Sequence, residues 1–273
     1  MSLRRRSYDL SGSTLTVESD LDVVLDRLDL VFGCFRIERH RLTDRRYRVL
    51  KSEQSIALSI DGGSGISFES VGQVEEYVQW HMSQSALSIV RSDAVVLHAA
   101  AVARIRDDLH RAIVLIGPSG SGKSTLTHEL LRNGFGFLSD EALFVDASGH
   151  AVRGFPRALG LMAETQKGQL QGEGAKEYID PFSLAVPVLR DPIPVECLVL
   201  LMGRASQSQL ETLAPIQALP ALLKQVYATE PVSSILEALV RLVTSHPTFA
   251  LKSGDPVEAA AMIANLLPAL VAA

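Results

Sequence analysis

The chain has few cysteines, few aromatic residues and no excess of positive charge, and the first and last of these shortages each argue against a class of protein. Its 273 residues include two cysteines, and aromatic residues make up 5% of the chain. Cys34 and Cys197 are far apart and have apolar neighbours, which argues against a disulfide framework or a cysteine metal site and favours buried thiols. The formal net charge of -5 argues against a general nucleic-acid binder, which would carry an excess of basic residues.

Long apolar runs are also missing. No stretch of about 18 apolar residues occurs, and no apolar stretch follows the basic residues at the N-terminus. We therefore expect a soluble, cytoplasmic protein with no nucleic-acid or membrane partner. A composition of 47% hydrophobic and 21% charged residues is that of a globular protein, with one large domain or a domain and a smaller companion.

What the chain does have is a complete phosphate-binding loop (P-loop) pattern, G-x-x-x-x-G-K-[ST], at residues 117–125. The apolar run 112–116 precedes it, and residues 124–132 have a helical pattern that ends at Asn133-Gly134. Strand, loop and helix in this order would place a phosphate at a helix N-terminus, where NH groups and the helix dipole favour an anion. The residues predicted to bind nucleotide are Gly117, Pro118, Ser119, Gly120, Ser121, Gly122, Lys123, Ser124 and Thr125.

Two residues of this loop have separate chemical roles. Lys123, expected to be exposed, would neutralise charge on the β- and γ-phosphates, and Ser124 would give a hydroxyl ligand to Mg²⁺. A glycine- and serine-rich turn without a ligand is the weaker alternative, since the full pattern occurs in its required context.

The chemistry at the γ-phosphate depends on carboxylates, and Asp140 and Glu141 are the candidates. They follow the apolar residues 135–138 at the end of a predicted strand, although Ser139 interrupts the usual apolar-to-acid pattern. One carboxylate can bind the metal while the other accepts the proton of a substrate hydroxyl. Two solvated acids in a turn are the alternative interpretation.

Three further side chains are ambiguous. His98 lies inside the apolar run 95–102, where a histidine satisfied within the core is the default. Arg153 and Arg157 can pair with phosphate oxygens or be ordinary surface charges, and the sequence does not decide between these.

A dense group of arginines lies between residues 36 and 48, opposed only by Glu38 and Asp44. A solvated hairpin face is the simpler interpretation, and a docking surface for an acidic peptide is the alternative. The group consists of Arg36, Arg39, Arg41, Arg45, Arg46 and Arg48.

Hydrophobic periodicity divides the chain into an N-terminal accessory α+β region, residues 1–90, and a catalytic region, residues 91–273. The polar stretch 164–176 is interpreted as a mobile loop over the site or a solvated connection. Helices are predicted at 20–32, 73–90, 216–227, 233–244 and 256–267. Strands are predicted at 47–50, 55–60, 66–69, 135–138, 142–145, 151–153 and 196–202, and a hairpin over 94–116.

Four motifs in order resemble the HPr kinase/phosphorylase-like family, most closely its HPr-kinase-related branch found in peptide-modification gene clusters. They are Leu97-His98-Ala99-Ala100-Ala101-Val102, the loop 117–125, Leu138-Ser139-Asp140-Glu141 and Phe155-Pro156-Arg157, and they cover roughly residues 90–165. The resemblance implies a fold related to phosphoenolpyruvate carboxykinase and the phosphorylation of a serine hydroxyl with ATP and Mg²⁺. Bifunctional members carry two successive aspartates where this chain has Asp140-Glu141, so the expectation does not extend to phosphorylase activity or to HPr as the substrate.

The resemblance also implies roles for individual residues. Ser124, Asp140 and Glu141 would hold Mg²⁺, either Asp140 or Glu141 would be the base, and His98 would help to position the acidic pair. Oligomers are frequent among these kinases, so a homo-oligomer is possible, but the sequence does not give the oligomeric state of this chain.

We therefore predict an α/β P-loop kinase whose catalytic residues are Asp140, Glu141, His98 and Lys123. Its acceptor would be a serine on a peptide or protein partner. Two alternatives stay open: a nucleotide-switched ATPase or binding module, and a small-molecule kinase that acts on free serine.

Overall fold

The computed structural model describes the chain apart from residues 1–2, 11, 39–41, 90–93, 107–108, 163–175, 228–231 and 267–273. The chain divides into two compact units, Met1–Ser92 and Asp93–Ala273, and both mix helices with sheets. The α/β class predicted from the sequence is therefore confirmed. In the described ranges, no helix has the length and apolar character needed to span a membrane.

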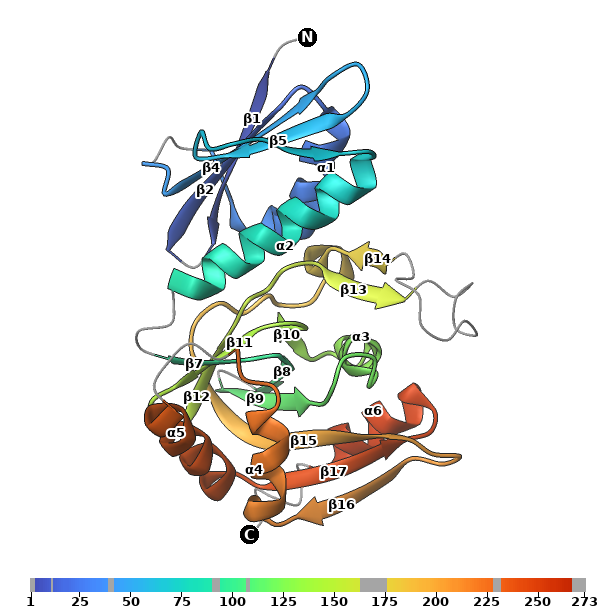
Figure 1. Cartoon of the computed structure of the whole chain (residues 1–273). Helices are drawn as coiled ribbons and strands as arrows, with labels where there is room; N and C mark the ends of the chain where they lie inside the picture. Colours follow the sequence, from blue (N-terminus) through green and yellow to red (C-terminus); the bar gives the residue numbers. More distant parts are fainter. Residues whose placement is uncertain are drawn as a thin grey trace. The chain divides into compact units, whose positions relative to one another are not determined.

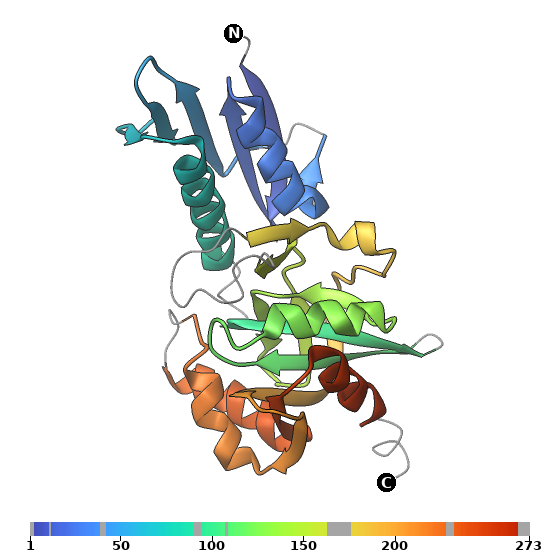
Figure 2. The same cartoon turned by 90° about the vertical axis from the view of Figure 1, so that its right-hand side faces the viewer.

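The N-terminal unit is a six-stranded sheet with two helices on one face (Figures 1 and 2). The strand order is β3-β1-β2-β4-β5-β6, and only the neighbours β2 and β4 are parallel. Parallel neighbours need a crossover, and α1 lies within the connection from β2 to β4. The strands are β1 (Arg4–Leu10), β2 (Ser13–Ser19), β3 (Arg36–Ile37), β4 (Arg45–Lys51), β5 (Ile56–Ile60) and β6 (Ile66–Phe68), and the helices are α1 (Asp22–Phe32) and α2 (Val71–Ile89).

The two faces of this sheet differ because side chains alternate along a strand. In β4, Tyr47 and Val49 are fully buried, whereas Arg46 and Arg48 between them are exposed. The helices cover the apolar face with the stripe predicted for residues 20–32, of which Val24 and Leu28 are fully buried. The opposite face of the sheet is polar.

The C-terminal unit is built on a nine-stranded sheet whose main path is β10-β8-β9-β15-β12-β11-β7. The long strand β15 is parallel to both β9 and β17, and β16 pairs with β17. The strands are β7 (Ala94–Leu97), β8 (Ala99–Arg106), β9 (Leu109–Ile116), β10 (Gly136–Ser139), β11 (Leu143–Asp146), β12 (Ala151–Gly154), β15 (Ile193–Arg204), β16 (Gln209–Leu213) and β17 (Thr248–Ser253). A separate pair consists of β13 (Leu159–Met162) and β14 (Lys176–Ile179).

Two hydrophobic clusters lie against this sheet, and each includes buried residues of two helices. One cluster includes α3 (Lys123–Arg132) and α6 (Pro256–Asn265), which contact each other. The other includes α4 (Pro215–Leu223) and α5 (Val232–Ser245), which also pack together (Figure 1). Cys197 lies in the first cluster, and both it and Cys34 are buried free thiols, as predicted.

Several boundaries differ from those predicted. The apolar run around His98 is broken at that residue: β7 pairs with β11, whereas β8 pairs with β9 and β10. The helix predicted at 216–227 ends at Leu223, because the backbone that follows pairs with the chain around β7. The polar stretch 164–176 lies outside the described residues except for Lys176. Strands β1, β2, β3, β13, β14, β16 and β17 were not predicted.

Candidate functional site

The backbone of the loop between β9 and α3 requires glycine at three positions. Gly120 and Gly122 have φ values of 78° and 96°, in the left-handed region that side chains disfavour. Gly117 is held closely, because a Cβ there would lie 2.7 Å from the Ser121 hydroxyl oxygen and 3.2 Å from the Leu201 Cβ. The loop therefore has the strand, turn and helix context that the pattern predicts.

Polar groups inside this loop are arranged as an anion site would need. Gly122 is the N-cap of α3 and has no side chain to cap the first NH groups of the helix. The buried hydroxyl oxygen of Ser121 has no hydrogen-bond partner among the described residues. An uncapped helix start and an unsatisfied hydroxyl within the same loop both fit a bound phosphate.

Lys123 differs from its prediction as an exposed loop residue. It is the first residue of α3 and is only 5% exposed. Its ammonium donates hydrogen bonds to the carbonyl oxygens of Gly117 (2.7 Å) and Pro118 (3.2 Å). The lysine is buried because its side chain folds back over the loop, which places its positive charge beside the backbone that would wrap a phosphate.

Asp140 is linked to this loop through the next residue of α3. The Ser124 hydroxyl donates to Asp140 Oδ2 at 3.4 Å, and the backbone NH of Gly160 donates to the same oxygen at 3.1 Å. Asp140 follows β10 directly and is 6% exposed. A hydroxyl and a carboxylate oxygen are ligands that Mg²⁺ accepts. The described residues contain no group of three or more His, Cys, Asp or Glu side chains able to share a metal ion.

Ser139, which interrupts the predicted motif, holds the turn that carries the two acids. Its buried hydroxyl donates to the carbonyl oxygen of Phe155 at 3.1 Å. The same oxygen accepts from the backbone NH groups of Glu141 and Ala142, both at 3.2 Å. An apolar residue at this position could make none of these bonds, so the interruption is part of how the turn is built.

Glu141 faces a different partner from Asp140. Its carboxylate forms an ion pair with Arg157, which is 7% exposed. Burial lowers the pKa of Arg157, but the negative charges of Glu141 and Asp140 outweigh it and leave the pKa raised, so the guanidinium stays charged. Arg157 is thereby assigned to the acidic pair, whereas Arg153 lies over the Phe144 ring at 4.8 Å.

His98 reaches this region through Tyr227. The backbone NH of His98 donates to the carbonyl oxygen of Gln225 at 2.7 Å, and its ring meets the Tyr227 ring edge-on at 6.0 Å. Burial raises the pKa of Tyr227, and the charge of Glu141 raises it further. Tyr227 therefore contacts the His98 ring, and the charge of Glu141 acts on its hydroxyl.

Sequence reasoning missed two of these contributors. The Gly160 NH acts through the backbone and belongs to no motif. Tyr227 was assigned to the end of a helix, and nothing in the sequence links it to His98. Arg157 was noticed but left undecided, because a single arginine after Phe155-Pro156 has no pattern that identifies its partner.

No protein-family model matches the chain, and no curated protein matches it. One solved structure similar to it is the HPr(Ser) kinase/phosphatase from Coxiella burnetii, with 15% sequence identity and a TM-score of 0.24. The match covers 55% of this chain and 88% of the other. A similarity at this identity and TM-score does not establish a shared family, so the HPr-kinase-like fold stays a prediction.

Proposed function

We propose that the chain is a phosphotransferase that uses ATP and Mg²⁺ to phosphorylate a hydroxyl group, and that the acceptor is a serine of a peptide or protein. The observation that carries the proposal is the hydrogen bond from Ser124 to Asp140. It joins a glycine loop at a helix N-terminus to a buried carboxylate, which is the pairing that a nucleotide phosphate with its metal requires.

Each part of the site has a role in this proposal. The NH groups of the loop and the Lys123 ammonium would bind the phosphates, and Ser124 and Asp140 would hold Mg²⁺. Bound Mg²⁺ would offset the negative charge of the β- and γ-phosphates.

The two acids are given separate tasks because their surroundings differ. Asp140 Oδ2 already accepts from Ser124 and Gly160, so it suits a fixed metal ligand. The Glu141 side chain is 32% exposed and can reach a substrate hydroxyl, so we assign it as the group that accepts the proton of that hydroxyl. Arg157 would orient the Glu141 carboxylate, and His98 would act through Tyr227 as a positioning residue.

The choice of a peptide or protein acceptor has a separate source. It comes from the order of the four motifs, which resembles HPr-kinase-related proteins of peptide-modification clusters.

The test is incubation of the full chain with γ-labelled ATP and Mg²⁺, alone, with a serine-bearing peptide encoded beside the gene, and with free serine. Label on the peptide that is lost in Lys123→Ala and Asp140→Asn, but kept in the exposed-lysine control Lys252→Ala, would support the proposal. Label on free serine alone would overturn the peptide acceptor. Label found only as inorganic phosphate would overturn phosphotransfer and favour a nucleotide-switched ATPase.

A further inference from the structure

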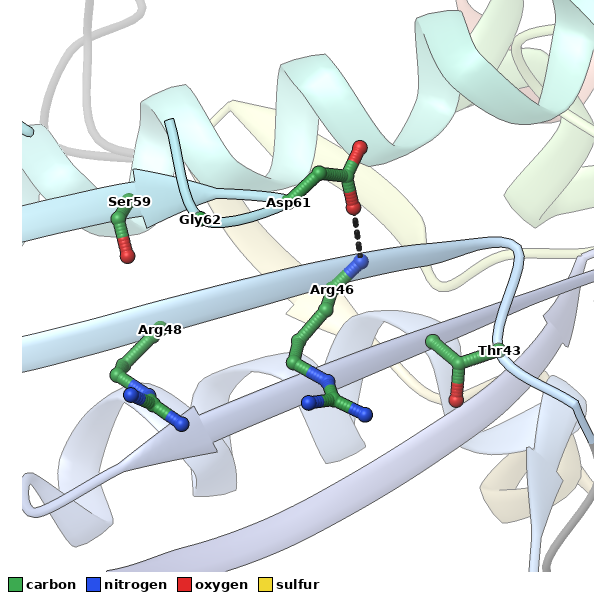
Figure 3. A pocket seen from close by; sticks show the side chains of 6 residues that line it. All are labelled: Thr43, Arg46, Arg48, Ser59, Asp61 and Gly62. Atoms are coloured by element: carbon green, nitrogen blue, oxygen red, sulfur yellow. Dashed lines mark hydrogen bonds between the residues drawn. The ribbon is translucent and has the colours of Figure 1, made fainter. Parts of the chain in front are cut away.

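The polar face of the N-terminal sheet contains a pocket that the proposed phosphotransfer does not use. Its volume is about 420 Å³, and it is lined by Thr43, Arg46, Arg48, Ser59, Asp61 and Gly62. Figure 3 shows the side chains of Thr43, Arg46, Arg48 and Ser59 pointing to the same side. Two guanidinium groups and two hydroxyl groups therefore face one space, and all of them can donate hydrogen bonds.

The two arginines share a single acidic neighbour. Arg48 donates to Glu18 Oε2 from Nε at 3.1 Å and from Nη2 at 2.9 Å. Arg46 Nε is 4.0 Å from the other carboxylate oxygen, and its guanidinium makes no hydrogen bond to any described residue. Both side chains are about half exposed, at 51% and 47%. One carboxylate therefore faces two cations, and Arg46 keeps its donors available.

The second acid of the pocket is committed elsewhere. Asp61 Oδ1 accepts from the backbone NH of Arg46 at 2.7 Å, the contact drawn as a dashed line in Figure 3. Its other oxygen lies 3.5 Å from Arg45 Nε. These contacts tie Asp61, in the turn after β5, to the start of β4, so its carboxylate does not neutralise the guanidinium groups of Arg46 and Arg48. Among the described residues between Arg36 and Lys51, five are basic and two are acidic, which adds to the positive field.

The spacing of the two arginines indicates the shape of a ligand. They lie two residues apart on β4, so their side chains leave the same face of the sheet about 6–7 Å apart. An extended peptide with acidic residues at every second position presents carboxylates on one side at the same spacing. Arginine binds carboxylate in a paired geometry that suits this match.

We infer that this face docks an extended acidic segment of a peptide, with Asp or Glu at alternate positions opposite Arg46 and Arg48. The inference rests on the proposed function only in taking the docked peptide as the bearer of the acceptor serine. Docking itself needs no nucleotide, so it can be measured apart from phosphotransfer.

The experiment is fluorescence anisotropy of the full chain at low salt with two labelled peptides of identical composition. One carries four glutamates at alternate positions. The other carries them as two separated adjacent pairs, so that no two glutamates lie two residues apart. We expect the alternating peptide to bind about tenfold more tightly, since only it can engage both arginines with charge-assisted bonds.

Three variants separate local docking from net charge. Arg46→Gln with Arg48→Gln should weaken binding of the alternating peptide at least about tenfold. Arg4→Gln with Arg36→Gln removes the same charge from arginines that pair with Asp22 and Asp29 of α1, and it should change binding less than about twofold. Glu18→Gln should tighten binding, because it removes the competing carboxylate.

Equal affinity for the two peptides, or an equal loss in the two double variants, would overturn the docking site. Displacement of the peptide by inorganic phosphate at low millimolar concentration would also overturn it, since the pocket would then bind anions without regard to spacing. Lys123→Ala is expected to bind the alternating peptide like the wild type. If it also retained phosphotransfer, the proposed function would fail while the docking site stood.

Discussion

The guanidinium of Arg157 binds the carboxylate of Glu141, while the neighbouring Asp140 accepts from Ser124 and from the Gly160 amide. Two adjacent acids are thus held by different parts of the C-terminal unit. Asp140 is fixed to the helix that follows the glycine loop, and Glu141 to a buried cation after β12. This separation is what allows one acid to serve the metal and the other the acceptor hydroxyl in the proposed reaction.

Replacing Arg157 with methionine tests the ion pair. The variant leaves the Glu141 carboxylate without its partner, and we expect roughly 1–3 kcal/mol lower stability in urea unfolding, because Glu141 is partly exposed and can be solvated. Phosphotransfer should fall much further than stability explains. Arg153→Met, at an arginine that packs on Phe144, is the matched control and should retain activity. Equal activity loss in both variants would contradict the assigned role.

Lys123→Ala tests the loop. The lysine donates two hydrogen bonds to loop carbonyls, so its loss should cost about 1 kcal/mol of stability despite its burial. Phosphotransfer should fall at least about 100-fold, since a charge aimed at the phosphates would be gone. Urea unfolding and label transfer measured on the same preparation separate the two effects. A variant that keeps full transfer would remove the loop from the active site.

Ser124→Ala tests the metal. Because the hydroxyl and Asp140 would share Mg²⁺, the variant should need at least about fivefold more Mg²⁺ for half-maximal phosphotransfer, with little change in unfolding. A magnesium titration at saturating ATP measures this shift. Thr127→Ala, at a buried hydroxyl one turn later on α3, should leave the magnesium dependence unchanged. An unchanged magnesium dependence in Ser124→Ala would exclude the hydroxyl as a ligand.

The glycine loop could be predicted from the sequence because its chemistry is local. Its glycines, lysine and serine are contiguous, and the strand and helix beside them follow from short-range periodicity. The helix predicted to end at Asn133-Gly134 does end there, with Gly134 at a φ of 84°. The helix predicted at 20–32 also forms, and its apolar stripe is buried as expected.

The surroundings of the acidic pair could not be predicted, because they are made by long-range contacts. Glu141 meets Arg157 only because β11 and β12 pair. Tyr227 comes close to His98 only because the chain after α4 pairs with β7. The sequence also did not predict that the apolar run is divided at His98 into two strands, β7 and β8. Uniformly apolar strands give no signal of where one strand ends and the next begins.

Acidification should destabilise the C-terminal unit through His246. Burial lowers its pKa below the ordinary 6.5, and the hydrogen bond from its Nδ1 to the Leu242 carbonyl opposes this only in part. The folded state then binds fewer protons than the unfolded chain. Its contribution to stability is fully present above pH 6.5 and is lost as the pH falls through the lowered pKa. Urea midpoints between about pH 7 and 5 should fall less steeply in His246→Gln than in the wild type; equal slopes would exclude this histidine.

Gly154 is the position where a single methyl group should do the most damage to the site. A Cβ there would lie 2.1 Å from the carbonyl oxygen of Leu138, two residues before Asp140, so β12 could not stay as close to β10. The obstacle is backbone rather than a flexible side chain, and relief would move the turn that Ser139 holds. We expect Gly154→Ala to lose at least about 3 kcal/mol of stability in urea unfolding.

Gly72→Ala is the control, because a Cβ at Gly72 in α2 meets nothing within 4 Å. Alanine favours a helix, so this variant should match or slightly exceed wild-type stability. Near wild-type stability in Gly154→Ala would mean that β10 and β12 can separate without cost, and the acidic pair would then have no fixed position relative to the loop.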